Sequence, residues 1–405
     1  DWSSDVCSSD LYMSTKYDFD KIIDRHGTGA LAVDVLNELY GRADLTPMWV
    51  ADMNFETPEF ITEALRSRLD HSLYGYTDMP AEFWPTVTKW IADHHQWNVK
   101  ADWMRFIPGI VKGIGFVINV FCKPDEKVII QPPVYHPFRL TPLGNKRQVV
   151  MNPLIMHEDG SYSMDFDGLA KVADEKCRVL ILANPHNPAG IVWDVDTLSR
   201  LADFCSERGI IVISDEIHCD MAHPGHKHHP FASVSERAAQ CSITFGAPSK
   251  TFNIAGIVSS YCVVPNEELR RPFFEWLDAN ELSEPTIFSP IATIAAFKYG
   301  EEWRQQMLEY VEANIDFVDN FLQTRIPQIK ALRPQASFLI WLNCRALNLD
   351  HDALNRLFVD GARLALNDGE MFGREGRGFM RMNIASPRAV LQDALERLEN
   401  AVKAL

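Results

Sequence analysis

The sequence predicts an α/β protein with a large domain built on a three-layer, mostly parallel sheet and a smaller α+β domain. Between about residues 105 and 265, short apolar runs alternate with helical patterns, which is typical of a parallel sheet covered by helices on both faces. Beyond about residue 285, long amphipathic segments flank short strands instead. The chain has 405 residues, 46% of them hydrophobic, so it can bury one large core and a smaller one.

Six apolar runs in the first part are short and bounded by turn residues, which predicts buried strands. A helix is predicted over 194–208, because Leu198, Leu201 and Phe204 recur at helical spacing and Gly209 follows as a stop. The six predicted strands are 127–131, 147–151, 178–183, 210–214, 241–245 and 259–264.

The later part of the chain predicts two long helices, at 301–324 and 387–405, and two strands, at 337–342 and 379–384. A hinge is expected at Glu284-Pro285. The expected organisation is a non-native leader at 1–12, an N-terminal segment of the small domain at 13–54, the large domain at 55–285 and the C-terminal small domain at 286–405.

The leader is rich in Ser and Asp and has neither a basic region nor an apolar core, so it does not resemble a signal peptide. Met13 is the expected start of the native chain, and Cys7 is set aside with the leader. The other seven cysteines are scattered without a CxxC pair, which favours a reduced, cytoplasmic protein over a disulfide framework.

Charge and hydropathy exclude two classes of partner. Lys and Arg number 39 against 55 Asp and Glu, a net charge of -16, so no phosphate-backbone footprint is present and nucleic acid is not expected. The longest apolar runs fall far short of the roughly 20 residues that a membrane helix needs. A histidine-rich stretch at 218–229 invites a zinc site, but Pro224, Gly225 and Pro230 interrupt it, so it is interpreted as a surface loop and no metal is expected.

Chemically useful side chains follow the predicted strands, where ligands of open α/β sheets bind. Tyr135 follows the first strand, Asn187 the third, Asp215 the fourth and Lys250 the fifth. Upstream, Gly109 opens an apolar helix whose free N–H groups can hold a phosphate. An aromatic ring, an amide, a carboxylate, an amine and a phosphate site together fit pyridoxal 5'-phosphate (PLP). The lysine forms an imine with its aldehyde, and the carboxylate keeps its ring nitrogen protonated.

The chain resembles the fold-type I PLP enzymes, which have an aspartate aminotransferase-like fold, and among them the MalY/PatB-like cystathionine β-lyase (C-S lyase) family of the class I/II aminotransferase superfamily. The matching segments span nearly all of residues 13–405 in the expected order, and several in register are far more specific than any one alone. They are MWVADMNF (48–55), YGYTDMP (74–80), QPPVYHPF (131–138), NPHNPAG (184–190), SDEIHCD (214–220), APSKTFNIAG (247–256) and RMNIASPR (381–388).

The resemblance implies a role for each residue around the cofactor ring. Lys250 is expected to carry the cofactor and to remove the Cα proton, and Asp215 to pair with the ring nitrogen. Tyr135 is expected to stack on one ring face, with Ile217 against the other. Asn187 is expected to face the phenolic oxygen together with His218, which occupies a position often held by tyrosine; a buried structural histidine is the alternative.

The resemblance also implies the phosphate and substrate contacts. Tyr76 of a neighbouring subunit is expected to complete the phosphate site of a homodimer, with Tyr74 as the alternative and an ordinary interface aromatic as the simpler reading. Arg381 is expected to grip the substrate carboxylate, unless it pairs with a structural carboxylate. The expected phosphate ligands are Gly109, Ile110, Val111 and Ser249, although Ser249 could simply cap its turn.

Three positions depart from the family pattern. Asn54 stands where the lyases usually have Asp, which affects local loop contacts more than chemistry. Ala247 replaces a common Ser or Thr, and Val258 stands where some aminotransferases carry a phosphate-binding Arg. Phosphate anchoring is therefore expected to depend on backbone amides and Ser249.

The expected activity is β-elimination on sulfur amino acids such as L-cystathionine or cysteine S-conjugates, giving thiol, pyruvate and ammonia. This choice follows from the resemblance, because the electron-sink chemistry is common to the whole superfamily. An aminotransferase on the same scaffold is the alternative. A regulatory binding protein is a third possibility, since relatives of this lyase group contact transcription factors, but an acidic surface does not indicate such a partner.

Overall fold

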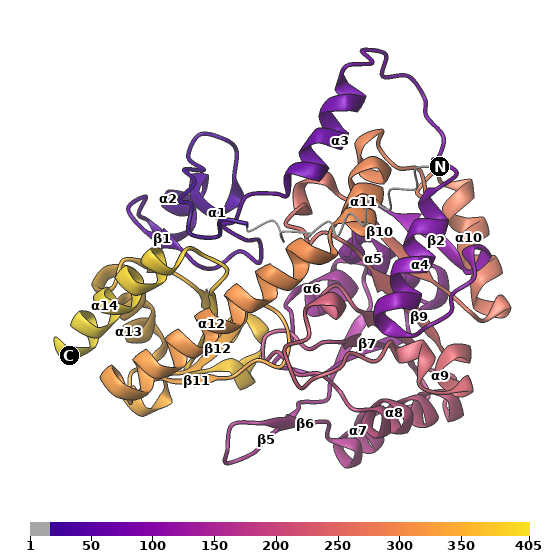
Figure 1. Cartoon of the computed structure of the whole chain (residues 1–405). Helices are drawn as coiled ribbons and strands as arrows, with labels where there is room; N and C mark the ends of the chain where they lie inside the picture. The colour runs from indigo at the N-terminus through magenta and orange to yellow at the C-terminus, as the bar shows by residue number, and fades with distance from the viewer. Residues whose placement is uncertain (1–16) are drawn as a thin grey trace, which may run out of the picture.

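The computed structural model describes residues 17–405, so the predicted leader at 1–12, with Cys7, and the predicted start at Met13 lie outside the described residues. A large sheet and a smaller one occupy different parts of the molecule (Figure 1). The large sheet comes from the middle of the chain, and the smaller one from the C-terminal part.

The large sheet has seven strands in the order β2-β10-β9-β8-β7-β3-β4. All six predicted strands are present, each within one residue of its predicted ends. Strand β10 runs antiparallel to both neighbours, while β3, β4, β7, β8 and β9 pair in parallel, which confirms the mostly parallel sheet. Edge strand β2 was not predicted. The strands are β2 (Met104–Ile107), β3 (Lys127–Ile130), β4 (Gln148–Met151), β7 (Cys177–Ala183), β8 (Ile211–Asp215), β9 (Ser242–Gly246) and β10 (Ser260–Val263).

Helices cover both faces of this sheet, because its strands are apolar on both sides. In β7, Val179 and Ile181 belong to the core under α5, α6 and α10, whereas Leu180 and Leu182 belong to the core under α7, α8 and α9. Helix α8 matches the helix predicted over 194–208 and is capped by the Asp194 side chain, which accepts from the amide of Thr197. The helices are α5 (Ile110–Phe121), α6 (Pro137–Gly144), α7 (Phe166–Val172), α8 (Val195–Glu207), α9 (Glu236–Gln240) and α10 (Glu267–Ala279).

The smaller sheet is antiparallel, in the order β11-β12-β15-β14. Both strands and both long helices predicted for this part are present. Strand β12 begins two residues late, because Ser337 has a φ of 76°, which a strand cannot accommodate. The elements are β11 (Lys330–Leu332), β12 (Leu339–Asn343), β14 (Asn367–Asp368), β15 (Phe379–Asn383), α12 (Glu301–Arg325), α13 (His351–Arg356) and α14 (Arg388–Lys403).

The N-terminal segment reaches the C-terminal part of the chain through a short parallel pair. Strand β1 (Thr46–Pro47) pairs with β13 (Leu364–Ala365), with α1 (Leu31–Asp34) and α2 (Leu36–Tyr40) just before it. A further hairpin joins β5 (Ile155–Met156) and β6 (Tyr162–Ser163).

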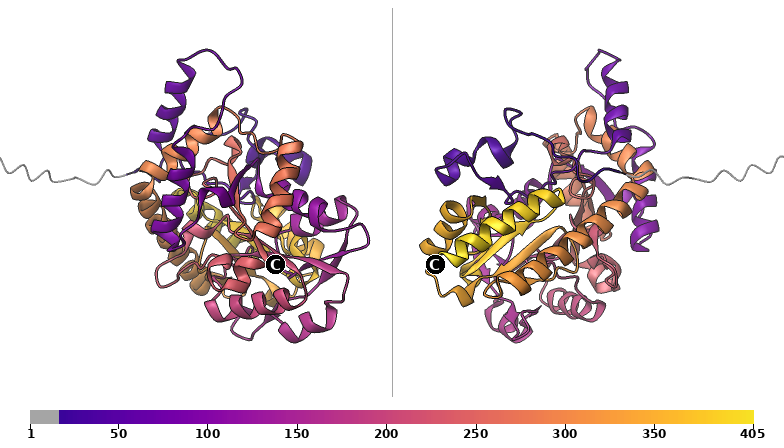
Figure 2. Two further views of the ribbon diagram at one scale, coloured as in Figure 1. Left: turned by 90° about the vertical axis from the view of Figure 1, so that its right-hand side faces the viewer. Right: turned by 60° about the vertical axis from the view of Figure 1, so that its left-hand side comes forward.

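Helix α3 (Glu59–Leu69) and the loop after it stand away from the body of the molecule (Figure 2). Helix α3 and the loop that follows it, residues 59–80, are called the arm here. The outer part of the arm exposes apolar side chains, among them Leu73, Tyr74 and Tyr76. Helix α11 (Phe288–Tyr299) packs against α3 and α4 (Phe83–His95), although it lies beyond the boundary expected at residue 285. The domain boundaries themselves stay a prediction.

Among the described residues 17–405, no helix combines the length and the apolar character required to cross a membrane.

Candidate functional site

The ends of the parallel strands meet at one edge of the large sheet. Ala183, Asp215 and Phe245 are aligned across β7, β8 and β9, so the turns that follow these strands start side by side. A cavity, called here the central cavity, lies at this edge and includes eight of the predicted site residues. It is lined by Ala51, Ile110, Val111, Tyr135, Phe138, Ala183, Pro185, Asn187, Asp215, Ile217, His218 and Lys250.

Asp215 is a buried carboxylate without a cationic hydrogen-bond partner among the described residues. It ends β8, is 8% exposed, and accepts a hydrogen bond from the amide of Ile217 at 3.1 Å. Burial, with a smaller contribution from the neighbouring Glu216, raises its pKa to about 7, against the opposing effect of the Ile217 amide and the charge of Lys250. A cation placed against this carboxylate would relieve the cost of its burial.

Lys250 lies in the turn after β9, where it borders the central cavity. Its Nζ donates to the backbone carbonyl of Ala51 at 2.6 Å. Burial and, to a smaller extent, the charge of Arg381 lower its pKa to about 8, against the opposing effect of Asp52 and Asp215. An amine of this pKa is partly neutral near physiological pH, which makes it a better nucleophile than an ordinary lysine.

Tyr135 and Asn187 come together from the turns after β3 and β7. The amide of Tyr135 donates to the carbonyl of Asn187 at 3.1 Å, and its ring lies edge-on to Phe138 with 6.0 Å between centroids. Ile217 lines the same cavity. The structure thus brings together the aromatic, amide and aliphatic side chains that were expected around a flat ring.

His218 is buried, but it is not a satisfied core histidine. Its Nδ1 has no hydrogen-bond partner within residues 17–405, and the side chain lines the central cavity. Burial lowers its pKa to about 3, helped by the positive charges of Lys250 and Arg381, so the imidazole is neutral at physiological pH. A neutral ring with a free nitrogen can hydrogen-bond a ligand oxygen.

A second pocket adjoins the central cavity and contains the expected phosphate ligands. Helix α5 begins here without a side-chain cap, and its first backbone bond runs from Gly113 to Gly109. The three amides before Gly113 therefore have no intrahelical acceptor and can bind an anion. Gly109 has a φ of 110°, which favours glycine, and its amide donates to Ser260 Oγ at 3.0 Å. The pocket lining includes Gly109, Ile110, Val111, Ile217, Ala247, Ser249, Lys250, Val258 and Ser260.

Arg381 is a buried guanidinium, 4% exposed, on β15. It forms no ion pair with a carboxylate in the described part of the chain. Its partners are neutral: the carbonyl of Trp49 at 2.8 Å and the side-chain oxygens of Asn187 at 3.0 Å and Asn367 at 2.5 Å. Burial lowers its pKa to about 10, and its Nε remains unpartnered. A buried cation held by neutral groups can receive an anionic ligand.

Tyr76 is not brought to this site within the chain. It is fully exposed on the arm, whereas the hydroxyl of Tyr74 donates to the carbonyl of Leu69 at 3.1 Å. Of the two candidates, Tyr76 is therefore the one whose hydroxyl has no partner recorded among the described residues.

The three departures from the family pattern have local consequences. The Asn54 side chain accepts from Arg25 Nη1 at 3.1 Å and donates to Ser386 Oγ at 2.8 Å, so it contributes loop contacts. Ala247 and Val258 line the second pocket, which contains the expected phosphate ligands, and their side chains add no charge to it. Val258 adopts a left-handed backbone with φ 56°, which is strained for a β-branched residue.

The interpretation of the histidine-rich stretch as a surface loop was wrong for three of its five histidines. His218, His223 and His228 are buried. His223 contacts the carbonyl of Ser337 at 2.6 Å, and His228 contacts the Glu216 carboxylate at 2.9 Å. The partners come from other segments, Ser337 from later in the chain and Glu216 from just after β8, and the local Pro and Gly pattern does not reveal them.

One group near this stretch has metal-ligand character: His95, Cys219 and Asp220, whose ligand atoms lie within 4.8 Å of one another. The Asp220 carboxylate already accepts from His95 at 2.8 Å, from Trp90 at 3.0 Å and from Thr251 at 3.2 Å. These donors satisfy the carboxylate, so the cluster is assigned as a buried hydrogen-bond network.

The arrangement as a whole fits PLP. A buried carboxylate needs a cation, a neutral imidazole has a free nitrogen, and an uncapped helix start faces a pocket next to Lys250. The protonated ring nitrogen of PLP matches Asp215, and its phenolic oxygen matches His218. Its phosphate matches the start of α5.

Sequence reasoning missed the residues that support this site from a distance. Ala51 and Ser260 were not predicted, although the first accepts from Lys250 and the second from Gly109. Asn383, Arg25 and Asp52 were also missed. Ala51, Asp52 and Asn383 lie inside segments that carried the family resemblance, but a shared motif does not reveal which neighbour a side chain contacts.

The profile of the family described as aminotransferase class I and II matches residues 45–398. The chain belongs to this family. It is 40% identical to cystathionine beta-lyase PatB of Bacillus subtilis (strain 168), over 95% of this chain and 99% of that protein. It is 33% identical to the protein MalY of Escherichia coli (strain K12), over 96% and 100%. The crystal structure of cystalysin from Treponema denticola, which contains a pyridoxal 5'-phosphate cofactor, has 35% identity and a TM-score of 0.93, covering 96% of this chain and 100% of that one.

Proposed function

We propose that this protein is a PLP-dependent carbon-sulfur β-lyase acting on sulfur amino acids such as L-cystathionine or cysteine S-conjugates. The observation that carries the proposal is one cavity edge that combines the Lys250 amine with the buried, cation-free Asp215 carboxylate, with Arg381 nearby. The choice of β-elimination is supported by the similarity to cystathionine beta-lyase PatB.

Each residue of the site then has a definite task. Bound PLP supplies an electron sink for the charge released at the substrate Cα. Asp215 holds the ring nitrogen protonated, and Tyr135 and Ile217 enclose the ring. Lys250 carries the cofactor and, once free, accepts the Cα proton at Nζ; its lowered pKa suits proton transfer near neutral pH. Arg381 binds the substrate carboxylate.

The remaining residues orient the cofactor. Asn187 and His218 donate to the phenolic oxygen. For His218 this requires the tautomer with a proton on the nitrogen that faces the cavity. The phosphate is bound by the free amides at the start of α5, those of Ile110 and Val111 among them, and by Ser249, because neither Ala247 nor Val258 offers a polar side chain. The Gly109 amide is already bonded to Ser260, so Gly109 contributes its backbone turn.

The test is a panel of substrates measured with the PLP-loaded enzyme and without any added keto acid. L-cystathionine should give thiol, pyruvate and ammonia in equal amounts, with repeated turnover. Keto-acid formation only when an amino acceptor is present would show that the alternative, an aminotransferase, is the correct assignment.

Arg381→Lys is expected to raise the KM for the amino-acid substrate by about tenfold or more with a smaller change in kcat, because an ammonium cannot make the bidentate contact. Steady-state kinetics on L-cystathionine measure both constants. An unchanged KM would show that the guanidinium does not bind the substrate carboxylate.

We further infer a homodimer in which Tyr76 of each protomer reaches the phosphate site of the other. The protruding arm supports this dimer, because it exposes apolar side chains to water and a second protomer would cover them. Tyr76→Phe should weaken PLP binding about tenfold, since one hydrogen bond to an anion is lost, while Tyr74→Phe should not. Light scattering checks the dimer and cofactor titration the affinities; a monomer at assay concentration would refute the shared site.

A cytoplasmic location is proposed on the state of the cysteines. The seven in residues 17–405 are all free and buried. Free thiols in a chain of this size fit a reducing compartment.

A further inference from the structure

The carbonyl that holds the Lys250 amine belongs to a segment with no regular structure of its own. Lys250 Nζ donates to Ala51 O at 2.6 Å, although the two residues are 199 positions apart. Ala51 lies in a bend between β1 and α3, so no helix or sheet fixes its backbone. Its position therefore depends on side chains that reach the segment from elsewhere.

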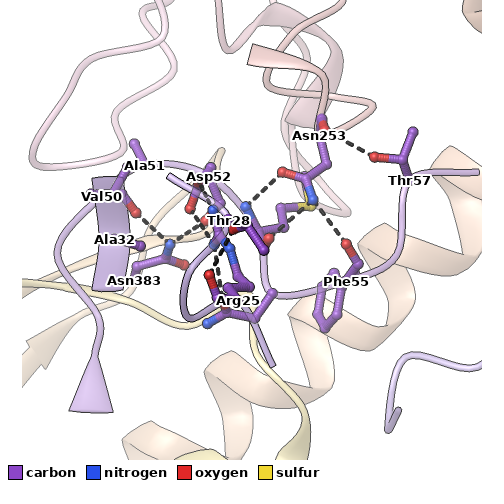
Figure 3. A network of polar contacts seen from close by, with 12 residues as sticks. Arg25, Thr28, Ala32, Val50, Ala51, Asp52, Phe55, Thr57, Asn253 and Asn383 are labelled. Atoms are coloured by element: carbon purple, nitrogen blue, oxygen red, sulfur yellow. Dashed lines mark hydrogen bonds and ion pairs between the residues drawn. The ribbon is translucent and has the colours of Figure 1, made fainter. Parts of the chain in front are cut away.

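The Asn383 side chain hydrogen-bonds the residues immediately before and after Ala51. Its Nδ2 donates to the carbonyls of Val50 at 2.7 Å and Asp52 at 2.5 Å, as Figure 3 shows. The carbonyl of Ala51 lies between these two anchored carbonyls, so the peptides on both sides of it are held in place and its own range of positions is narrowed. Asn383 is itself rigid, because it ends β15, is buried, and accepts from the amide of Ala385 at 2.8 Å.

Two other side chains hold the neighbouring parts of the segment. Arg25 binds the Asp52 carboxylate with both terminal nitrogens, at 3.0 and 2.6 Å. Asn253 donates to the carbonyls of Met53 at 3.0 Å and Phe55 at 2.9 Å (Figure 3). Asn253 also accepts from the amide of Met53 at 2.9 Å, so it holds one of the two peptides that Asn383 binds. Of these three side chains, Asn383 is the one that contacts the peptides on both sides of the Ala51 carbonyl.

We propose that Asn383 is a positioning residue for the catalytic amine: by fixing the carbonyls of Val50 and Asp52, it directs the Ala51 carbonyl at Lys250 Nζ and so holds the free, protonated form of this amine in place. The inference rests on the role proposed above for Lys250, and it deepens that role. Lys250 must be released from the cofactor when a substrate amine replaces it, and the Ala51 carbonyl then receives its N–H.

The expected consequence is a change in the proton affinity of Lys250. A carbonyl accepts more strongly from an ammonium than from an amine, so it raises the pKa of Lys250. Four charged or titratable groups also influence this pKa or lie beside the amine: Arg381 from β15, Asp52 from the same segment, Asp215 from β8 and His218 after it. Loss of the Ala51 acceptor should lower the pKa by about one unit.

The experiment measures this pKa in the cofactor-free enzyme, so it does not depend on the reaction. The rate of Lys250 acetylation by acetic anhydride is followed against pH, with the labelled peptide quantified by mass spectrometry. Asn383→Ala should lower the pKa by about one unit. The matched control is Asn253→Gly, which suits the φ of 55° at that position and removes the bond to only one of the two peptides that Asn383 holds. It should lower the pKa clearly less than Asn383→Ala does.

The result separates positioning from general disruption. A displaced Arg381 would raise the pKa, because its positive charge lowers it now. The Asp52 carboxylate, whose loss would lower the pKa, remains held by both terminal nitrogens of Arg25 in the variant, so a fall identifies the lost acceptor. If Asn383→Ala does not fold, Asn383→Ser takes its place, since a hydroxyl can still accept from Ala385 but cannot span two carbonyls. An unchanged pKa in the folded variant, or an equal fall in Asn253→Gly, would overturn the proposal. Failure of the substrate panel alone would refute the lyase activity and leave this result standing.

Discussion

Replacing Lys250 with alanine is expected to abolish the yellow colour and the borohydride-reducible adduct of the PLP-loaded protein, and to lower turnover by about three orders of magnitude or more. In the proposed function the amine is the nucleophile that binds the cofactor, and its pKa of about 8 leaves part of it neutral near physiological pH. Absorbance, and mass spectrometry of the reduced peptide, measure the adduct, while pyruvate release measures turnover.

The control for this change is Lys171→Ala, which removes an exposed lysine on α7 that lines neither the central cavity nor the pocket beside it. It should keep the colour, the adduct and the activity. A reducible adduct that survives in Lys250→Ala would mean that another lysine carries the cofactor, and the assignment of the site would fail.

Asp215→Asn is expected to impair the PLP-loaded protein and to stabilise the cofactor-free protein. In the PLP-loaded form, loss of the carboxylate should weaken cofactor binding by about a hundredfold or more, because a buried charge partner is removed and the ring nitrogen is no longer held protonated. Turnover should fall by orders of magnitude. Cofactor titration and pyruvate release measure these losses, and wild-type activity in the variant would contradict the role.

In the cofactor-free form, the same substitution should stabilise the fold above pH 7. The pKa of Asp215 is raised to about 7, so its contribution to stability is fully present below the unfolded-state pKa near 4 and is lost as pH rises through 7. Asparagine carries no charge and avoids this loss. The melting temperature of cofactor-free Asp215→Asn should therefore exceed that of the wild type at pH 8 and approach it at pH 5.

A lower melting temperature at pH 8 would show that Asp215 is a structural carboxylate. Scanning calorimetry at the two pH values decides between these outcomes. The matched control is Asp220→Asn, where the carboxylate is fully hydrogen-bonded and its pKa is held low by His95, so substitution should destabilise the fold.

Strands could be predicted closely from sequence because a buried strand needs a short apolar run, and β7 and β8 contain little else. The direction of β10 could not, since antiparallel and parallel central strands have the same apolar composition. The start of β12 was misplaced for a different reason: the left-handed backbone of Ser337 is imposed by its surroundings and has no signature in that residue.

The reactive groups themselves were accessible from sequence. Asp215 and Lys250 directly follow strong strand patterns, and the parallel order of β8 and β9 places both at one edge. The unpartnered Nδ1 of His218 could not be predicted from sequence, because it depends on which hydrogen-bonding groups of the folded chain lie near the ring. The burial of His223 and His228 was likewise decided by distant partners, Ser337 and Glu216 respectively.

The sequence by itself determined the sheet, the family and the side chains proposed for the chemistry, because these follow from local hydropathy and from residue types at fixed spacing. The tertiary structure decided how those side chains are held. Ala51 contributes only a backbone carbonyl, which every residue possesses, so no pattern singles it out before folding brings it to Lys250. Asn383 acquires its role in the same way, through packing of a C-terminal strand against an N-terminal bend.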